Sequence, residues 1–171
     1  MFDILFLFLF LISVLQVDLL RENLSVAIAV SPYGLLIRIF MIILSLYLLY
    51  VSFPHTKDLK RPKLGKGILI TACLLMIIGM MFTYHKDVHD LTSSLHLYLT
   101  LSSVVLYFLY DGFYTAELFL TNVKKATRLR MILMTGITMV MIVMFTFGAI
   151  NGLGEFLALA TLLTFHKVLD Q

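Results

Sequence analysis

Long apolar runs, separated by short polar segments, fill most of this chain and constrain what it can fold into. A helix rises about 1.5 Å per residue, so about 20 residues cross a hydrocarbon core about 30 Å thick. The runs are continuously apolar rather than alternating, which favours helices over a β-barrel. We predict an all-α, polytopic integral membrane protein: a single transmembrane domain over residues 1–171, built as a six-transmembrane-helix bundle. Its spans cover about residues 2–20, 33–53, 67–84, 91–110, 131–150 and 153–168.

The composition of the chain also requires a membrane. Of the 171 residues, 61% are hydrophobic and 13% are charged, whereas a soluble domain is about half apolar and about a quarter charged. A soluble fold of this size could not bury that excess, so lipid must be the solvent for much of the chain. The six spans leave no room for an extramembrane domain of any size.

Lysine and arginine are concentrated in alternate connections of the predicted bundle. The 54–66 connection holds five of them, the 111–130 connection four and the C-terminal tail one, whereas the opposite connections hold only Arg21 and Lys86. Cytoplasmic connections of membrane proteins carry an excess of these residues. We therefore predict that the N-terminus and the C-terminus are both cytoplasmic, and that the protein resides in the cell (plasma) membrane.

Three segments need a separate interpretation. The first run could be a signal peptide, but it has no basic start and carries Asp3 instead, so we interpret it as a span. The outer connection 21–34 is unusually apolar, and we expect it to fold back onto the helix bundle. The 111–123 segment mixes apolar residues with Asp111 and Glu117. It either extends the fourth span or lies along the inner surface as an amphipathic segment.

Polar side chains in or beside the spans gather toward the predicted outer face, and three of them are histidines. His85, His89 and His96 are offset by four and eleven residues, which places the imidazoles on one face if the helix begins near Tyr84. Imidazoles four residues apart can bind one metal ion, although no supporting glutamate or third-ligand motif accompanies them. Two other interpretations stay open: pH-sensitive hydrogen bonding, and a polar loop at the headgroup boundary.

Arg38 and Glu155 complete this predicted outer cluster. Arg38 lies about one turn inside the second span, and Glu155 begins the sixth at a comparable depth. A permanent cation there needs a carboxylate or a route to water, so we predict an ion pair between the two, or else that Arg38 snorkels to the surface. In this hypothesis the pair and the three histidines line one outward-facing pocket that binds a headgroup or a small polar solute.

Motifs of catalysis and of cofactor binding are absent from the sequence. The chain has no Gly-rich phosphate loop, no serine nucleophile elbow and no Cys-x-x-Cys. We identify no histidine pair deep in facing spans of the kind that binds haem. Charge at mid-membrane is also missing, which argues against a proton- or ion-driven pump. We expect no cofactor, no catalytic residue and no nucleic-acid partner.

Four short stretches give the chain a resemblance to a known family. They are Ser31-Pro32-Tyr33-Gly34, Ile78-Gly79-Met80-Met81-Phe82, a histidine early in the fourth span (His89 or His96) and Asn151-Gly152-Leu153-Gly154-Glu155. With these stretches, the layout resembles the six-helix DRAM-like family, which includes the fibroblast-growth-factor-receptor-activating-protein group and its uncharacterised bacterial relatives. The resemblance implies a lipid-linked or accessory membrane role, and it implies no active-site residues.

We expect a non-enzymatic multi-pass protein that binds a membrane lipid or another membrane protein and has an accessory role in membrane or envelope processes. Two alternatives stay open. One is a small transporter or permease subunit. The other is a membrane-embedded, metal-dependent hydrolase that uses His85, His89 and His96.

Overall fold

The computed structural model describes residues 7–8, 11–12, 18–85, 90–147 and 151–170, and these residues form helices and no strands. Five of the helices are long and apolar enough to cross a membrane. The predicted all-α class is confirmed, and the composition of these helices identifies a multi-pass membrane protein. The predicted first span lies mostly outside the described residues. The elements are α2 (Leu24–Val30), α3 (Gly34–His55), the 3-10 helix η1 (Thr56–Asp58), α4 (Pro62–Met81), α5 (Leu91–Leu118), α6 (Val123–Phe147) and α7 (Gly152–Leu169).

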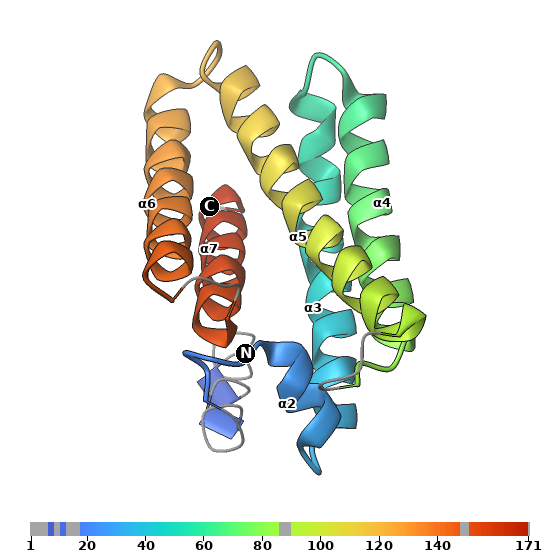
Figure 1. Cartoon of the computed structure of the whole chain (residues 1–171). Helices are drawn as coiled ribbons and strands as arrows, with labels where there is room; N and C mark the ends of the chain where they lie inside the picture. The colour runs from blue at the N-terminus through green and yellow to red at the C-terminus, as the bar shows by residue number, and fades with distance from the viewer. Residues whose placement is uncertain (1–6, 9–10, 13–17, 86–89, 148–150, 171) are drawn as a thin grey trace.

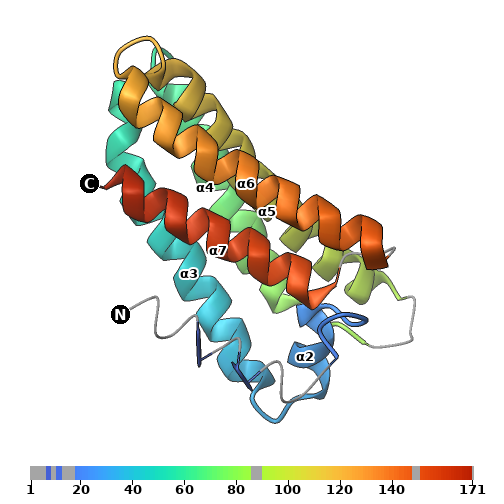
Figure 2. The same cartoon turned by 90° about the vertical axis from the view of Figure 1, so that its left-hand side faces the viewer.

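The five long helices run up and down in two groups (Figure 1). Helices α3, α4 and α5 form one group, α6 and α7 form a pair, and α5 leans across so that its C-terminal end approaches α6. One end of the bundle carries η1 and the α5–α6 connection, and we call it the basic end because most lysines and arginines lie there. The opposite end carries α2, and we call it the α2 end. Figure 2 shows α7 between α3 and α6.

Helices α2, α5 and α7 begin at the α2 end with a side-chain cap. Asn23, Asp90 and Asn151 each accept a hydrogen bond from the backbone N–H three residues later, at 3.1, 2.7 and 2.9 Å. Such caps satisfy amide groups that have no partner within the helix. Helix α4 begins instead at Pro62, whose missing N–H costs nothing at that position.

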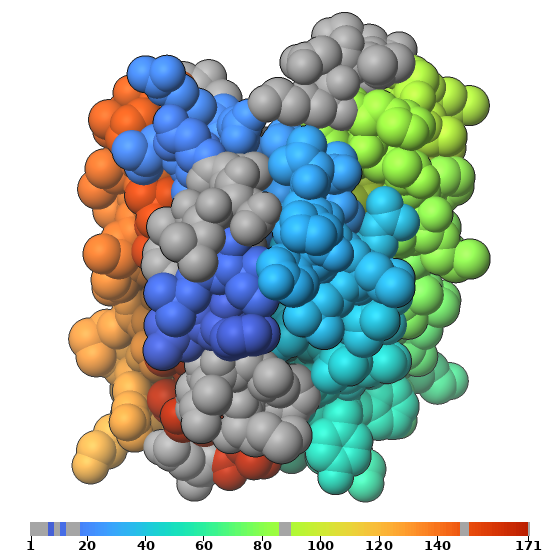
Figure 3. All heavy atoms as spheres, turned by 90° about the horizontal axis from the view of Figure 1, so that it is seen from below, coloured from blue at the N-terminus to red at the C-terminus, as the bar shows by residue number. Residues whose placement is uncertain are grey.

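Helix α2 packs on the bundle rather than extending from it, and residues 24–28 are all buried. Gly34 permits the close approach, because a Cβ there would lie 2.0 Å from the carbonyl oxygen of Ile28. The start of α7 is attached to the same segment, since the backbone N–H of Gly152 donates to Glu22 O at 2.7 Å. The expectation that the apolar 21–34 connection folds back onto the bundle is confirmed. Figure 3 shows this segment between α6 and α7 on one side and the start of α5 on the other.

Helix α5 is the longest element, and its 28 residues correspond to about 42 Å. It continues through Asp111 to Leu118, so residues 111–118 of the 111–123 segment extend the helix and residues 119–122 form the turn to α6. Helix α6 begins at Val123, which places Lys124 and Arg130 within its first turns. Both basic connections are therefore short, and several of their cations, among them Lys63 and Lys124, lie on the first turns of helices.

Helix α6 is the least buried span and α7 the most buried. The two helices touch most closely at Gly136, where a Cβ would lie 2.1 Å from Thr161 Oγ1. The four buried residues of α6 all lie between Ala126 and Gly136. The remaining half, residues 137–147, has no buried residue among the part of the chain that the structure describes.

Candidate functional site

His96 is buried at the α2 end, where α5 meets both α2 and α4. Its Nδ1 lies 2.9 Å from the carbonyl oxygen of Gly79, and its Nε2 lies 2.9 Å from Ser25 Oγ. A carbonyl only accepts, so Nδ1 must donate, and Nε2 then accepts from the Ser25 hydroxyl. Both ring nitrogens are occupied, and His96 joins three helices. A metal ion could bind Nε2 only by displacing Ser25.

His85 lies just before α5 and contacts the residue that caps that helix. Its Nδ1 lies 2.8 Å from Asp90 Oδ2, and its backbone N–H donates to Ser93 Oγ at 2.9 Å. Hydrogen bonds from Ser93, and then that from His85, hold the pKa of the Asp90 carboxyl well below its ordinary 3.8, because they stabilise the ionised form. His85 is 49% exposed. The His85–Asp90 pair supports the N-terminal cap of α5.

The three histidines therefore do not form a metal site in the part of the chain that is described. His89 lies outside that part, and the nitrogens of His96 are used in packing. Across the described ranges, no three His, Cys, Asp or Glu side chains come close enough to hold a metal ion. His85 thus contacts the capping residue of α5, and His96 connects three helices by hydrogen bonds.

The predicted ion pair between Arg38 and Glu155 is wrong. Both residues are described, and no ion pair joins them. Glu155 instead accepts a hydrogen bond from the backbone N–H of Leu24, the first residue of α2. An amide at a helix N-terminus has no acceptor within its helix and favours an anion. The Glu155 side chain therefore connects the start of α7 to the start of α2. Arg38 is half-buried and lies within electrostatic range of His96.

Toward the basic end, the structure brings together a buried ionisable pair that sequence reasoning missed. His166 Nε2 of α7 lies 3.5 Å from Asp111 Oδ1 of α5, and both side chains are 0% exposed. His166 Nδ1 lies 2.7 Å from the carbonyl oxygen of Leu162, so Nδ1 carries a proton. Neither oxygen of the Asp111 carboxyl has a hydrogen-bond partner among the described residues, and neither has His166 Nε2.

The prediction placed Asp111 at the inner boundary of the membrane, outside the fourth span. In the structure α5 continues for about two turns beyond Asp111, and the Asp111 side chain is buried. A sequence signal does exist: Tyr107, Tyr110, Asp111 and Tyr114 recur at the spacing of one helix face. All four are buried, so this stripe is the inward face of α5 and not part of a surface loop.

Ser52 of α3 is also buried and its hydroxyl has no hydrogen-bond partner among the described groups. Its carbonyl oxygen accepts from the hydroxyl of Tyr110, the residue before Asp111, but Ser52, His166 and Asp111 do not form a catalytic triad. A triad needs one imidazole nitrogen for the serine and the other for the aspartate. The Nδ1 of His166 is bound to Leu162 and its Nε2 faces Asp111, which leaves no nitrogen for Ser52.

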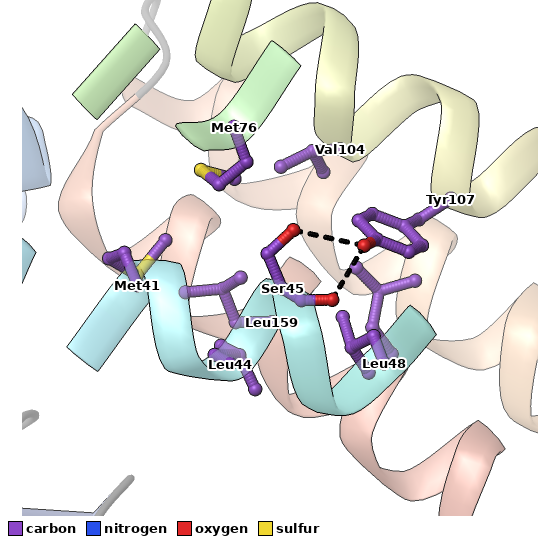
Figure 4. A pocket seen from close by; sticks show the side chains of 9 residues that line it. Met41, Leu44, Ser45, Leu48, Met76, Val104, Tyr107 and Leu159 are labelled. Atoms are coloured by element: carbon purple, nitrogen blue, oxygen red, sulfur yellow. Dashed lines mark hydrogen bonds between the residues drawn. The ribbon is translucent and has the colours of Figure 1, made fainter. Parts of the chain in front are cut away.

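A small pocket lies between α3, α4, α5 and α7 (Figure 4). Its lining is apolar except for Ser45 and Tyr107, whose hydroxyl oxygens lie 2.9 Å apart. The Tyr107 hydroxyl also lies 2.8 Å from the Ser45 carbonyl oxygen, to which it donates. The pocket has room for about one water molecule. In this conformation it cannot hold a lipid headgroup or a solute.

Comparisons of the chain with protein-family models, with curated proteins and with solved structures found no match. The resemblance to the DRAM-like family therefore stays a prediction. The geometry of the described residues carries the functional argument that follows.

Proposed function

We propose that this protein is a non-enzymatic, multi-pass membrane protein that binds a lipid or another membrane protein through its lipid-facing surface, with an accessory role in membrane processes. The observation that carries the proposal is the contrast between a closely packed interior and the open face of α6. The pocket described above is small and apolar, whereas residues 137–147 of α6 present large apolar side chains outward. A binding role of this kind acts at the surface of the bundle.

The exposed face of α6 is long, and half of its large side chains are methionines, which are flexible. Its large exposed residues are Met131, Met134, Ile137, Met139, Met141, Ile142, Phe145 and Phe147. Methionine side chains adapt to partners of irregular shape, and helices in lipid associate by close packing rather than by the hydrophobic effect. This face therefore suits a membrane-embedded partner or a bound lipid chain.

The orientation that we propose places the basic end in the cytoplasm and the α2 end outside, in the plasma membrane. The α3–α4 and α5–α6 connections lie at the same end of the bundle (Figure 1), so their lysines and arginines face one side. The positive-inside rule assigns that side to the cytoplasm. With a first span over residues 2–20, both termini would be cytoplasmic.

Photo-crosslinking in native membranes tests the proposed binding surface. A photoreactive residue replaces Ile142 on α6, and a matched control replaces Leu74 on α4, which is also exposed, at 51% against 59%. We expect a discrete adduct, with one lipid class or one protein, at position 142 and only bulk lipid adducts at position 74. The same adduct pattern at both positions would count against the proposal.

A second candidate is a small transporter or permease subunit, and one observation favours it. Ionisable residues within spans often mark ion or substrate pathways, and Asp111 with His166 is such a pair. Transport across liposomes by the wild-type protein, lost in Asp111→Asn, would favour this candidate. The hydrolase alternative has no comparable support from the described residues, because His96 uses both nitrogens in packing.

A further inference from the structure

We propose that Asp111 and His166 form a binding site for a single proton between α5 and α7. Three buried atoms lack hydrogen-bond partners among the described residues: both carboxyl oxygens of Asp111 and Nε2 of His166. Unpaired polar atoms in a buried position are costly, so a proton that pairs them would stabilise the folded state.

The positions of the atoms show what would complete the site. Because Nδ1 of His166 donates to Leu162 O, a neutral ring presents a lone pair at Nε2, 3.5 Å from Asp111 Oδ1. An ionised Asp111 also presents a lone pair there. Two acceptors then face each other, and the one that carries a full charge accepts no hydrogen bond from any described group. One proton between the two atoms satisfies both.

The proton has two ways to occupy the site. It forms either a neutral pair, in which the carboxyl O–H donates to Nε2, or an ion pair, in which the imidazolium N–H donates to the carboxylate. Both forms hold one proton more than the empty site. The separation of 3.5 Å must shorten by about 0.5–0.8 Å to reach the usual hydrogen-bond length, which small side-chain rotations supply.

Two tyrosine hydroxyls on the buried face of α5 donate to backbone carbonyls of α3 rather than to Asp111. From α5, the Tyr110 hydroxyl donates to Ser52 O at 3.2 Å, and Tyr107 donates to Ser45 O. Each phenol has one proton to donate, so neither is free for Asp111. Tyr114 stacks on Tyr110, with 6.2 Å between ring centroids.

Charged groups on the neighbouring elements are also engaged elsewhere. His55 at the end of α3 lies within electrostatic range of His166, and its Nδ1 is 3.8 Å from Asp58 of η1. From α6, the Lys125 ammonium donates to the carbonyl oxygen of Leu169 at 2.8 Å. Lys167, on α7 itself, is exposed. A proton therefore fits this site better than a metal ion, which would need further ligands.

Spectroscopy on the full-length protein in lipid nanodiscs tests the proposal. Difference infrared spectra detect the carbonyl stretch of a protonated carboxylic acid, and 15N NMR of labelled histidine separates imidazolium from neutral imidazole. Near neutral pH, wild type is expected to show one of two signatures: a protonated carboxylic acid, or a doubly protonated His166 beside an ionised carboxylate. The variant His166→Gln identifies the His166 resonance.

Matched variants assign the proton to this pair. Asp111→Asn keeps the size of the side chain and offers an N–H donor to Nε2, so we expect it to abolish the signature. Asp90→Asn changes the half-exposed carboxylate beside His85 and is expected to leave the signature intact. A signature that survives in Asp111→Asn would overturn the proposal. So would the absence of both signatures in wild type, a result that does not depend on any variant folding.

Discussion

His96 connects α2, α4 and α5 through its two ring nitrogens, one to Gly79 and one to Ser25. Replacing it with leucine leaves the buried Ser25 hydroxyl without its acceptor, which typically costs about 1–3 kcal/mol. We expect His96→Leu to lower the thermal unfolding temperature of the detergent-solubilised protein. The measurement is a thermal melt followed by loss of helical signal.

A double-mutant cycle separates the Ser25 contact from general packing at His96. Ser25→Ala removes the orphaned hydroxyl, so adding it to His96→Leu should cost less than Ser25→Ala costs alone. Strictly additive losses would mean that the Nε2–Oγ hydrogen bond contributes nothing.

Asp90 supports the start of α5 only while its carboxyl is ionised. Hydrogen bonds from Ser93 and His85 hold its pKa below the ordinary 3.8. A lowered pKa means that the contribution to stability is present at neutral pH and is lost as the pH falls through the acidic range below that value. Asp90→Asn keeps a capping oxygen but does not titrate. We therefore expect wild type to lose more stability than Asp90→Asn between neutral and strongly acidic pH, as measured by thermal melts. Parallel pH profiles would rule out this role.

Helix α6 packs closely against α7 at Gly136. A Cβ at this position would lie 2.7 Å from the Cβ of Thr161. A Cβ is fixed to the helix backbone, so it cannot move aside as the tip of a long side chain can. Gly136→Ala should destabilise the protein by about 1–3 kcal/mol, the usual cost of overpacking. Gly67→Ala is the matched control, because nothing lies within 4 Å of a Cβ there. Alanine favours a helix over glycine, so the control should be neutral or stabilising in thermal melts. A loss of equal size in both variants would contradict this account of the contact.

The long helices could be predicted because apolar runs and their lengths are local properties of the sequence. The helix α3, for example, begins at Gly34, one residue from the expected start of the second span. Partner choice is not local. Glu155 had two acceptable donors at similar depth, Arg38 and the N-terminus of α2. Because the 21–34 connection folds back onto the bundle, Glu155 binds the N-terminus of α2.

The pair Asp111–His166 escaped prediction for a related reason. Its members are 55 residues apart, and only the packing of α5 against α7 brings them together. Asp111 also stands beside a polar stretch, which made it resemble the end of a span. The tyrosine spacing on the same helix face indicated burial, but it did not indicate the histidine opposite.

We propose that the whole bundle crosses the bilayer with its basic end in the cytoplasm. Single cysteines placed at the two ends report this directly. The one native cysteine, Cys73, is buried, so Cys73→Ser gives a background without accessible thiols. Arg21 at the α2 end and Lys60 at the basic end are both exposed and suit replacement by cysteine.

Labelling of these variants in intact cells with a membrane-impermeant maleimide is the most direct measurement. We predict that Arg21→Cys is labelled in intact cells and that Lys60→Cys is labelled only after the membrane is permeabilised. Labelling of both in intact cells would contradict a membrane crossing between them, and the reverse pattern would contradict the proposed orientation.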